Sequence, residues 1–196
     1  MWEIPAASPG AREIDVKDGR IHHWAGAIFV PGATLDGVLA RISALAGREQ
    51  DHYDDVVASK LLGRQDEGYR IFMRLRRSHL VTVTFNTEHA VQNRRLTTGR
   101  ATARSVATRI AEIEDAGSPG EREKPPGDDS GYLWRLNAYW RYEAVDGGVL
   151  IECESVSLSR GVPWLLRPVA NPIVDRIARE SLRNTLVSLQ KFLRRS

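Results

Sequence analysis

Alternating hydrophobic and polar residues predict a series of β-strands between residues 20 and 157. The alternating segments lie at residues 20–30, 69–76, 81–86 and 101–113, with a short strand at 56–62 and a hairpin at 131–157. Helical spacing of apolar residues instead predicts a helix over 35–46, a second short helix over 51–55, and a long C-terminal helix from residue 171. This order of strand, two short helices, antiparallel strands and closing helix predicts an α+β fold.

The hairpin has the clearest local signal, because Asp146-Gly147 separates two alternating runs. A two-residue turn there pairs Trp140 with Cys153, Tyr142 with Ile151, Ala138 with Ser155, Arg141 with Glu152, and Tyr139 with Glu154. One face of the hairpin is therefore aromatic and apolar, and the other carries paired charges. Two arrangements are open: the charged face lies in solvent, or it lines a polar patch of a cavity. We favour solvent, because buried charges are costly unless each is paired.

The C-terminal helix is amphipathic. Its apolar stripe consists of Val174, Ala178, Leu182, Thr185, Leu186, Leu189 and Phe192. The opposite face is basic, with Arg176, Arg179, Arg183 and Arg194. Transient contact with an anionic membrane is compatible with that face, but Asp175 and Glu180 interrupt it, and a charged helix face is most often simply solvated.

Four short segments carry a resemblance to a known superfamily. They are Gly32-Ala-Thr-Leu35, Val57-Ala-Ser-Lys-Leu-Leu62, Leu158-Ser-Arg160 followed by Pro163, and Glu180-Ser-Leu182. Together, over residues 20–195, the chain resembles the START-like (SRPBCC, helix-grip) superfamily of polyketide cyclase-like and lipid-transfer proteins, and within it a bacterial branch without an agreed ligand. The resemblance implies a curved antiparallel sheet of about seven strands wrapped around the C-terminal helix, with a cavity between them. It implies no catalytic residue, because the superfamily shares no catalytic motif.

Length and composition favour a single domain. The chain has 196 residues, 28 basic and 25 acidic, with a net charge of +3, which calls for no nucleic-acid partner. We expect an irregular leader over residues 1–18, a START-like domain over 19–196, and a mobile Pro- and Gly-rich loop over 115–131. Cys153 is the only cysteine, so no intrachain disulfide can form. No membrane span or signal peptide is visible, which fits a soluble protein of the cytoplasm or an exported protein whose signal has been removed.

Candidate chemistry is sparse. The five histidines (His22, His23, His52, His79 and His89) show no spacing typical of a metal site, and no phosphate- or dinucleotide-binding motif is present. We therefore expect neither metal nor cofactor. His23 and Glu154 are the residues to test as proton-transfer groups, although structural roles are commoner for such residues.

The preferred hypothesis is a non-catalytic protein that binds or carries a small apolar ligand, such as a lipid or polyketide, between the sheet and the C-terminal helix. Loop 115–131 or the first helical segment would act as a gate. The expected ligand contacts are Trp24, Arg135, Asn137, Tyr139, Trp140, Arg141, Leu182 and Leu186. The alternatives are a cyclase- or aromatase-type enzyme that uses His23 and Glu154, and an interaction module with a filled core.

Overall fold

The computed structural model describes residues 2–5, 16–78, 82–161 and 167–194, with side chains for 16–78, 82–161 and 176–194. The strands are β1 (Trp2–Pro5), β2 (Gly19–Pro31), β3 (Val56–Gln65), β4 (Gly68–Ser78), β5 (Thr82–Thr97), β6 (Arg100–Glu114), β7 (Arg122–Glu123), β8 (Arg135–Val145) and β9 (Gly148–Arg160). The helices are α1 (Leu35–Ala44), the 3-10 turn η1 (Glu49–Asp51) and α2 (Arg167–Arg194).

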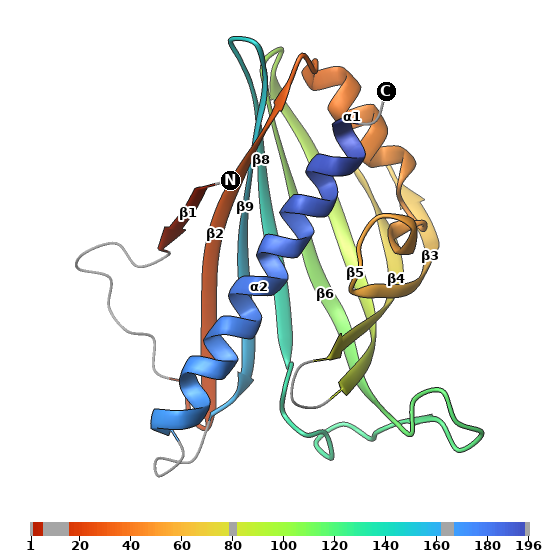
Figure 1. The fold of residues 1–196 in the computed structure, drawn as a ribbon. Coiled ribbons are helices and arrows are strands. Elements are labelled where there is room, and N and C mark those ends of the chain that lie inside the picture. The colour runs from red at the N-terminus through yellow and green to blue at the C-terminus, as the bar shows by residue number, and fades with distance from the viewer. Residues whose placement is uncertain (1, 6–15, 79–81, 162–166, 195–196) are drawn as a thin grey trace.

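The strands form one antiparallel sheet in the order β1-β2-β9-β8-β6-β5-β4-β3, with β7 paired to β6. The sheet curves, and α2 crosses its concave face (Figure 1). Seven strands are long, and β1 and β7 are short additions. This is the α+β helix-grip architecture that was predicted. Within the described part of the chain, neither helix is long and apolar enough to cross a membrane.

Three elements differ from the sequence-based expectation. The second helix is the turn η1 at Glu49–Asp51, not a helix over 51–55, because the chain must already turn toward β3 at Val56. Residues 2–5, expected to be irregular, form β1 on the edge of β2. Strand β5 is much longer than the predicted segment 81–86 and continues to Thr97. It continues because the alternation persists, with polar residues occupying some inward positions.

The hairpin forms with the predicted register. All five predicted pairs, from Trp140 opposite Cys153 to Tyr139 opposite Glu154, are present in β8 and β9. Tyr142, Ile151 and Cys153 are buried, whereas Arg141 on the other face is exposed. A two-residue turn fixes the register because a slip by one residue would exchange the two faces.

The principal core lies where α1 and α2 pack on β2, β8 and β9. It contains Ile28, Val30, Val149 and Ile151 from the sheet, Leu35 and Val38 from α1, and Leu182, Leu186, Leu189 and Leu193 from α2. The predicted stripe of α2 is therefore confirmed from residue 182 onward, while the side chain of Val174 lies outside the described residues. Smaller clusters form around Phe85 and around Tyr69.

One extra residue in β6 changes which side chains face inward. Glu88 pairs with Arg109 but the next residue, His89, pairs with Ala107, so Thr108 has no opposite residue. The Thr108 hydroxyl donates a hydrogen bond to the Glu88 carbonyl at 3.2 Å. Because of this β-bulge, inward positions change from odd numbers, such as Ser105, to even numbers beyond it.

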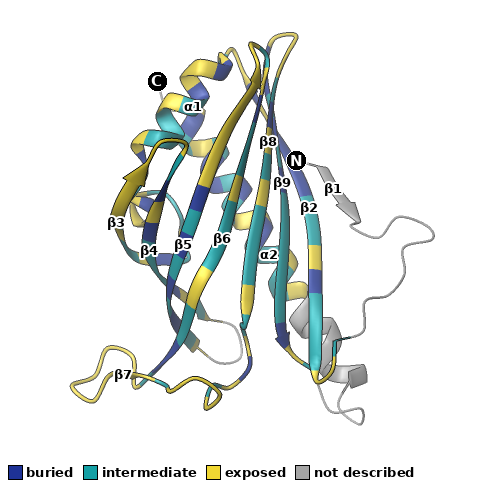
Figure 2. Cartoon of the chain, turned by 180° about the vertical axis from the view of Figure 1, so that it is seen from behind, coloured by how far each residue is buried: buried dark blue, intermediate teal, exposed yellow. Residues whose placement is uncertain are grey.

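The loop over 115–131 is attached to the sheet at several points. Its strand β7 pairs with the end of β6, and Lys124 lies 2.6 Å from the carboxylate of Glu112. Glu121 forms an ion pair with Arg74 at 2.5 Å. Viewed from behind the sheet, much of this segment is nevertheless exposed (Figure 2). The mobility expected for it stays a prediction.

Candidate functional site

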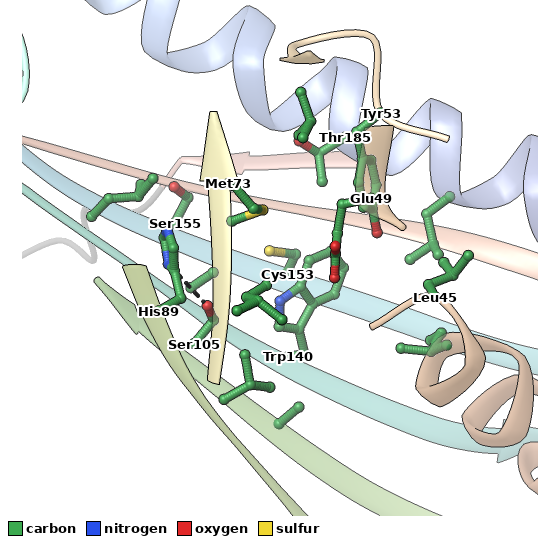
Figure 3. Close-up of a pocket in the computed structure, with 18 of the residues that line it drawn as sticks. Leu45, Glu49, Tyr53, Met73, His89, Ser105, Trp140, Cys153, Ser155 and Thr185 are labelled. Atoms are coloured by element: carbon green, nitrogen blue, oxygen red, sulfur yellow. Dashed lines mark hydrogen bonds between the residues drawn. The ribbon is translucent and has the colours of Figure 1, made fainter. Parts of the chain in front are cut away.

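A cavity of about 210 Å³ lies between the concave face of the sheet and helix α2 (Figure 3). Strands β3–β6, β8 and β9 supply its floor, α2 one side, and η1 with the end of α1 another. Its apolar wall includes Leu45, Val56, Ile71, Met73, Leu75, Val91, Leu136, Trp140, Leu182 and Leu189. The rest of the lining is polar and includes Glu49, Asp55, Arg77, His89, Ser105 and Ser155. A mainly apolar wall with polar groups at fixed positions is typical of small-molecule sites.

Of the sequence-predicted contact residues, two line the cavity: Trp140 from β8 and Leu182 from α2. Leu186 is 1% exposed and packs inside the principal core. Trp24 packs against the same core from β2. Both belong to the concave side of the sheet, but neither is part of the cavity lining.

The four predicted polar contacts lie on the opposite face of β8. Arg135, Tyr139 and Arg141 are exposed on the convex side, together with the half-buried Asn137. Arg141 pairs with Glu152 at 3.1 Å. In solvent the two charges keep their hydration, whereas inside the cavity further hydrogen bonds would be needed to offset the cost of removing them from water. From the convex face, these four side chains do not reach a ligand inside the cavity.

The pair considered for proton transfer also lies on the convex face. The His23 Nε2 atom is 2.5 Å from Glu154 Oε1, and both side chains are more than one third exposed. Neither residue lines the cavity. The pair is therefore a cross-strand contact between β2 and β9, on the face of the sheet opposite this cavity.

A different histidine, His89 of β5, faces the cavity. The hydroxyl of Thr87 donates to the Met73 carbonyl at 3.0 Å, so it accepts from His89 Nε2 at 3.1 Å. The Nδ1 atom is then an acceptor for the Ser105 hydroxyl at 3.3 Å. Burial of the ring, which is 3% exposed, lowers the pKa of His89 to about 4. His89 is thus a neutral polar group in the cavity floor.

Small residues line the floor next to His89. Ser105, Ala138 and Ser155 lie opposite one another on β6, β8 and β9, so they form one row across the sheet. Their short side chains leave room above the sheet, which larger residues in the same row would occupy. Figure 3 shows Ser155 and Ser105 on either side of the His89 ring.

Glu49, in η1, is another buried titratable group of the cavity lining. Gly47 adopts a left-handed conformation (φ +86°), and a Cβ atom there would lie 2.5 Å from the Leu61 backbone nitrogen, so the turn requires glycine. The Gly47 N–H donates to both carboxylate oxygens of Glu49, at 3.0 and 3.2 Å. These and other hydrogen bonds favour the charged form, but burial outweighs them and raises the pKa of Glu49.

Three tyrosines of the cavity wall lie close to one another: Tyr53, Tyr69 and Tyr142. Burial raises the pKa of all three, to about 12 for Tyr69, so their hydroxyls are protonated at neutral pH. Trp140 stacks on Tyr142 with ring centroids 6.4 Å apart. Burial also raises the pKa of the neighbouring Cys153 thiol, which makes it an unreactive wall residue.

A charged pair completes the lining. Arg77 at the end of β4 forms an ion pair with Asp55 and a hydrogen bond to Ser181 of α2. Burial lowers the pKa of Arg77 to about 10, so it remains charged at neutral pH. The pair joins the start of β3, the end of β4 and helix α2. Among the residues with described side chains, no group of three His, Cys, Asp or Glu side chains is placed to hold a metal ion.

Solved structures with the same architecture include lipid-transfer and aromatase proteins. A fragment of the STAR-related lipid transfer protein from Xanthomonas axonopodis matches with a TM-score of 0.62 and 18% identity, over 93% of this chain and 97% of that chain. The Zhui aromatase/cyclase from Streptomyces sp. R1128 matches with a TM-score of 0.57 and 12% identity, over 90% and 95%. The chain has the START-like fold.

A START superfamily protein from Mycobacterium smegmatis also matches this START-like chain, with a TM-score of 0.55, 10% identity, and coverage of 88% and 97%. No protein-family model matches the sequence, and no curated protein does. At these identities the likeness establishes the fold and leaves the ligand open.

Sequence reasoning missed His89 and Glu49 for different reasons. His89 had a usable signal, because extending the alternation of Val83 and Phe85 by two more steps places Thr87 and His89 on the inner face. Glu49 had none, because only the tertiary approach of Gly47 to Leu61 turns its side chain inward.

Proposed function

We propose that this protein binds a compact apolar ligand in the cavity between its sheet and α2. The observation that carries the proposal is the cavity of about 210 Å³ with its mainly apolar wall, located between α2 and the sheet beside the principal core. Two of the structural neighbours are a lipid transfer protein and an aromatase/cyclase, which supports a small-molecule role.

The size of the cavity limits the ligand. A volume of about 210 Å³ is smaller than the roughly 300–1,000 Å³ of ordinary ligand sites. A single ring system or a short acyl chain is therefore the class of ligand that matches, rather than a diacyl lipid. Ser105, Ser155 and His89 offer such a ligand a few hydrogen-bonding groups in the floor.

The first test is native mass spectrometry of protein purified without refolding, combined with organic extraction. We expect an additional mass that extracts as an apolar compound. The matched variants are Ala138→Phe, which fills the floor of the cavity, and Asn137→Phe, which places the same ring on the convex face. Ala138→Phe should abolish the additional mass and Asn137→Phe should retain it. Equal ligand content in the two variants would contradict binding in this cavity.

A second candidate function is an enzyme of cyclase type, favoured by the neutral His89 and its hydrogen bond to Ser105 in the cavity. Such an enzyme positions a reactive chain and needs one group that accepts a proton. The test is conversion of a linear polyketide-like substrate by wild type and by His89→Gln. If His89→Gln still binds the substrate but forms no product, the enzyme is favoured. If wild type binds the substrate and leaves it unchanged, the carrier is favoured.

A further inference from the structure

The charges that line the cavity do not balance. Arg77 is paired with Asp55, and His89 is neutral, so these three residues contribute no net charge at neutral pH. Glu49 remains as the acidic group of the lining whose side chain takes part in no ion pair among the described residues. The cavity therefore has one acidic end.

Glu49 is also deeply buried, with 6% of its surface exposed. Its two oxygens share the N–H of Gly47, and the other groups that hydrogen-bond to the carboxylate are neutral as well. In Figure 3 the carboxylate projects toward the side of the cavity where Trp140 and Cys153 lie. A buried carboxylate without a cation is costly, and a bound cation would remove that cost.

The surroundings of Glu49 are aromatic. Tyr53 and Tyr69 lie close enough to Glu49 for its charge to help raise their pKa values, and Tyr142 lies close to both tyrosines. Among the described residues none of these three hydroxyls has a hydrogen-bond partner, and Trp140 extends the aromatic wall by stacking on Tyr142. Electron-rich ring faces around a carboxylate attract alkylated and protonated amines more strongly than neutral or anionic groups of equal size.

We propose that the Glu49 end of the cavity binds the cationic head of a compact amphiphile, a protonated or quaternary amine, with its apolar part over the Ser105–Ala138–Ser155 floor. This assignment rests on the proposed ligand-binding function and adds the charge of the ligand to it. Glu49 supplies the opposite charge, and Tyr53, Tyr69 and Tyr142 supply ring faces and hydroxyls.

The experiment compares three probes that share a six-carbon chain, by isothermal titration calorimetry on the full chain of the protein: hexyltrimethylammonium, 1-hexanol and hexanoate. For wild type we expect the cation to bind at least tenfold more tightly than the alcohol, and hexanoate to bind most weakly. Glu49→Gln should lower the affinity for the cation by about tenfold or more, and the affinity for the alcohol by less than about twofold. The amide oxygen introduced by this substitution can still accept from the Gly47 N–H, and urea unfolding checks that the variant is folded.

Two controls sharpen the result. Asp51→Asn removes the same charge from the same 3-10 turn at an exposed position, so it should leave all three affinities unchanged. If Glu49→Gln does not fold, variants of Tyr69 replace it in the test. Tyr69→Leu should lower the affinity for the cation selectively, whereas Tyr69→Phe should not, because Phe keeps the ring face.

The outcomes separate the two proposals. If 1-hexanol binds wild type as tightly as the cation, or if Glu49→Gln weakens both equally, the cationic head is refuted and the apolar cavity survives. If none of the three probes binds, both the cationic head and the proposed ligand site are refuted.

Discussion

The two halves of the sheet differ in how they meet α2. Strands β2, β9 and β8 pack against the helix through a dense core in which Ile28, Val149 and Ile151 are at most 1% exposed. Strands β3–β6 carry smaller apolar clusters around Phe85 and Tyr69, and the cavity opens above them. The same sheet thus provides a structural half and a binding half, and residues of β8 and β9 such as Ala138 and Ser155 extend the cavity floor into the structural half. Leu182 and Cys153 belong to both the core and the cavity wall, so stability and ligand selection are governed by overlapping sets of residues.

The largest expected effect comes from a charge in the structural half. Leu186→Arg places a guanidinium where a 1% exposed leucine packs on the sheet, without a partner for the charge. We expect the free energy of unfolding to fall by more than about 4 kcal/mol, or the protein not to fold. Urea or thermal unfolding measures this, and an unchanged melting temperature would show that α2 does not pack there.

A paired truncation compares the two halves directly. Ile151→Ala removes a fully buried side chain from the core, and we expect a loss of about 2–5 kcal/mol. Met73→Ala removes a half-buried side chain that already borders empty space, so its loss should be only about 1–2 kcal/mol because fewer contacts disappear. Urea unfolding of both variants gives the comparison. A greater loss for Met73→Ala would reverse the assignment of the halves.

The binding half should also carry a pH signature. Burial holds the pKa of His89 at about 4, below the value of about 6.5 expected when the chain is unfolded. As the pH falls, His89 is therefore protonated in the unfolded chain before it is protonated in the folded protein. The contribution of His89 to the free energy of unfolding is fully present above about pH 6.5 and is lost as the pH falls toward about 4. The shift corresponds to about 3 kcal/mol. His89→Gln should remove this component.

The measurement is the free energy of unfolding of wild type and His89→Gln at pH 7, 5.5 and 4. The difference between the two proteins isolates His89 from the other titrating groups. Parallel curves would mean that His89 is not buried in its neutral form.

Much of the structural half was predictable and much of the binding half was not. The register of β8 and β9 followed from Asp146-Gly147 and strict alternation, because both signals are local. The stripe of α2 was equally visible in the spacing of Leu182, Leu186 and Leu189. Trp140 and Leu182 were correctly placed beside the space between sheet and helix.

The polar residues of the cavity could not be derived in the same way. Alternation alone does not say which face of β8 is inward, and it was the cost of burying charges that favoured solvent for the face of Arg135, Asn137, Tyr139 and Arg141, as the structure has it. Glu49 turns inward through a contact between Gly47 and a distant strand, which no local pattern records. Placement of buried polar groups depends on tertiary contacts, and that is where sequence reasoning fails first.

The β-bulge at Thr108 gives β6 one residue that its pairing with β5 does not need. Deleting Thr108 would leave Ala107 opposite His89 and Arg109 opposite Glu88, so every residue beyond the bulge would keep its present face. Glu112 would still hold Lys124 and Ser130. A codon lost from the middle of β9 would instead exchange the faces of all residues beyond it, because β9 pairs with both neighbours without a bulge. Variation in chain length should therefore be tolerated at Thr108 and be absent from β9.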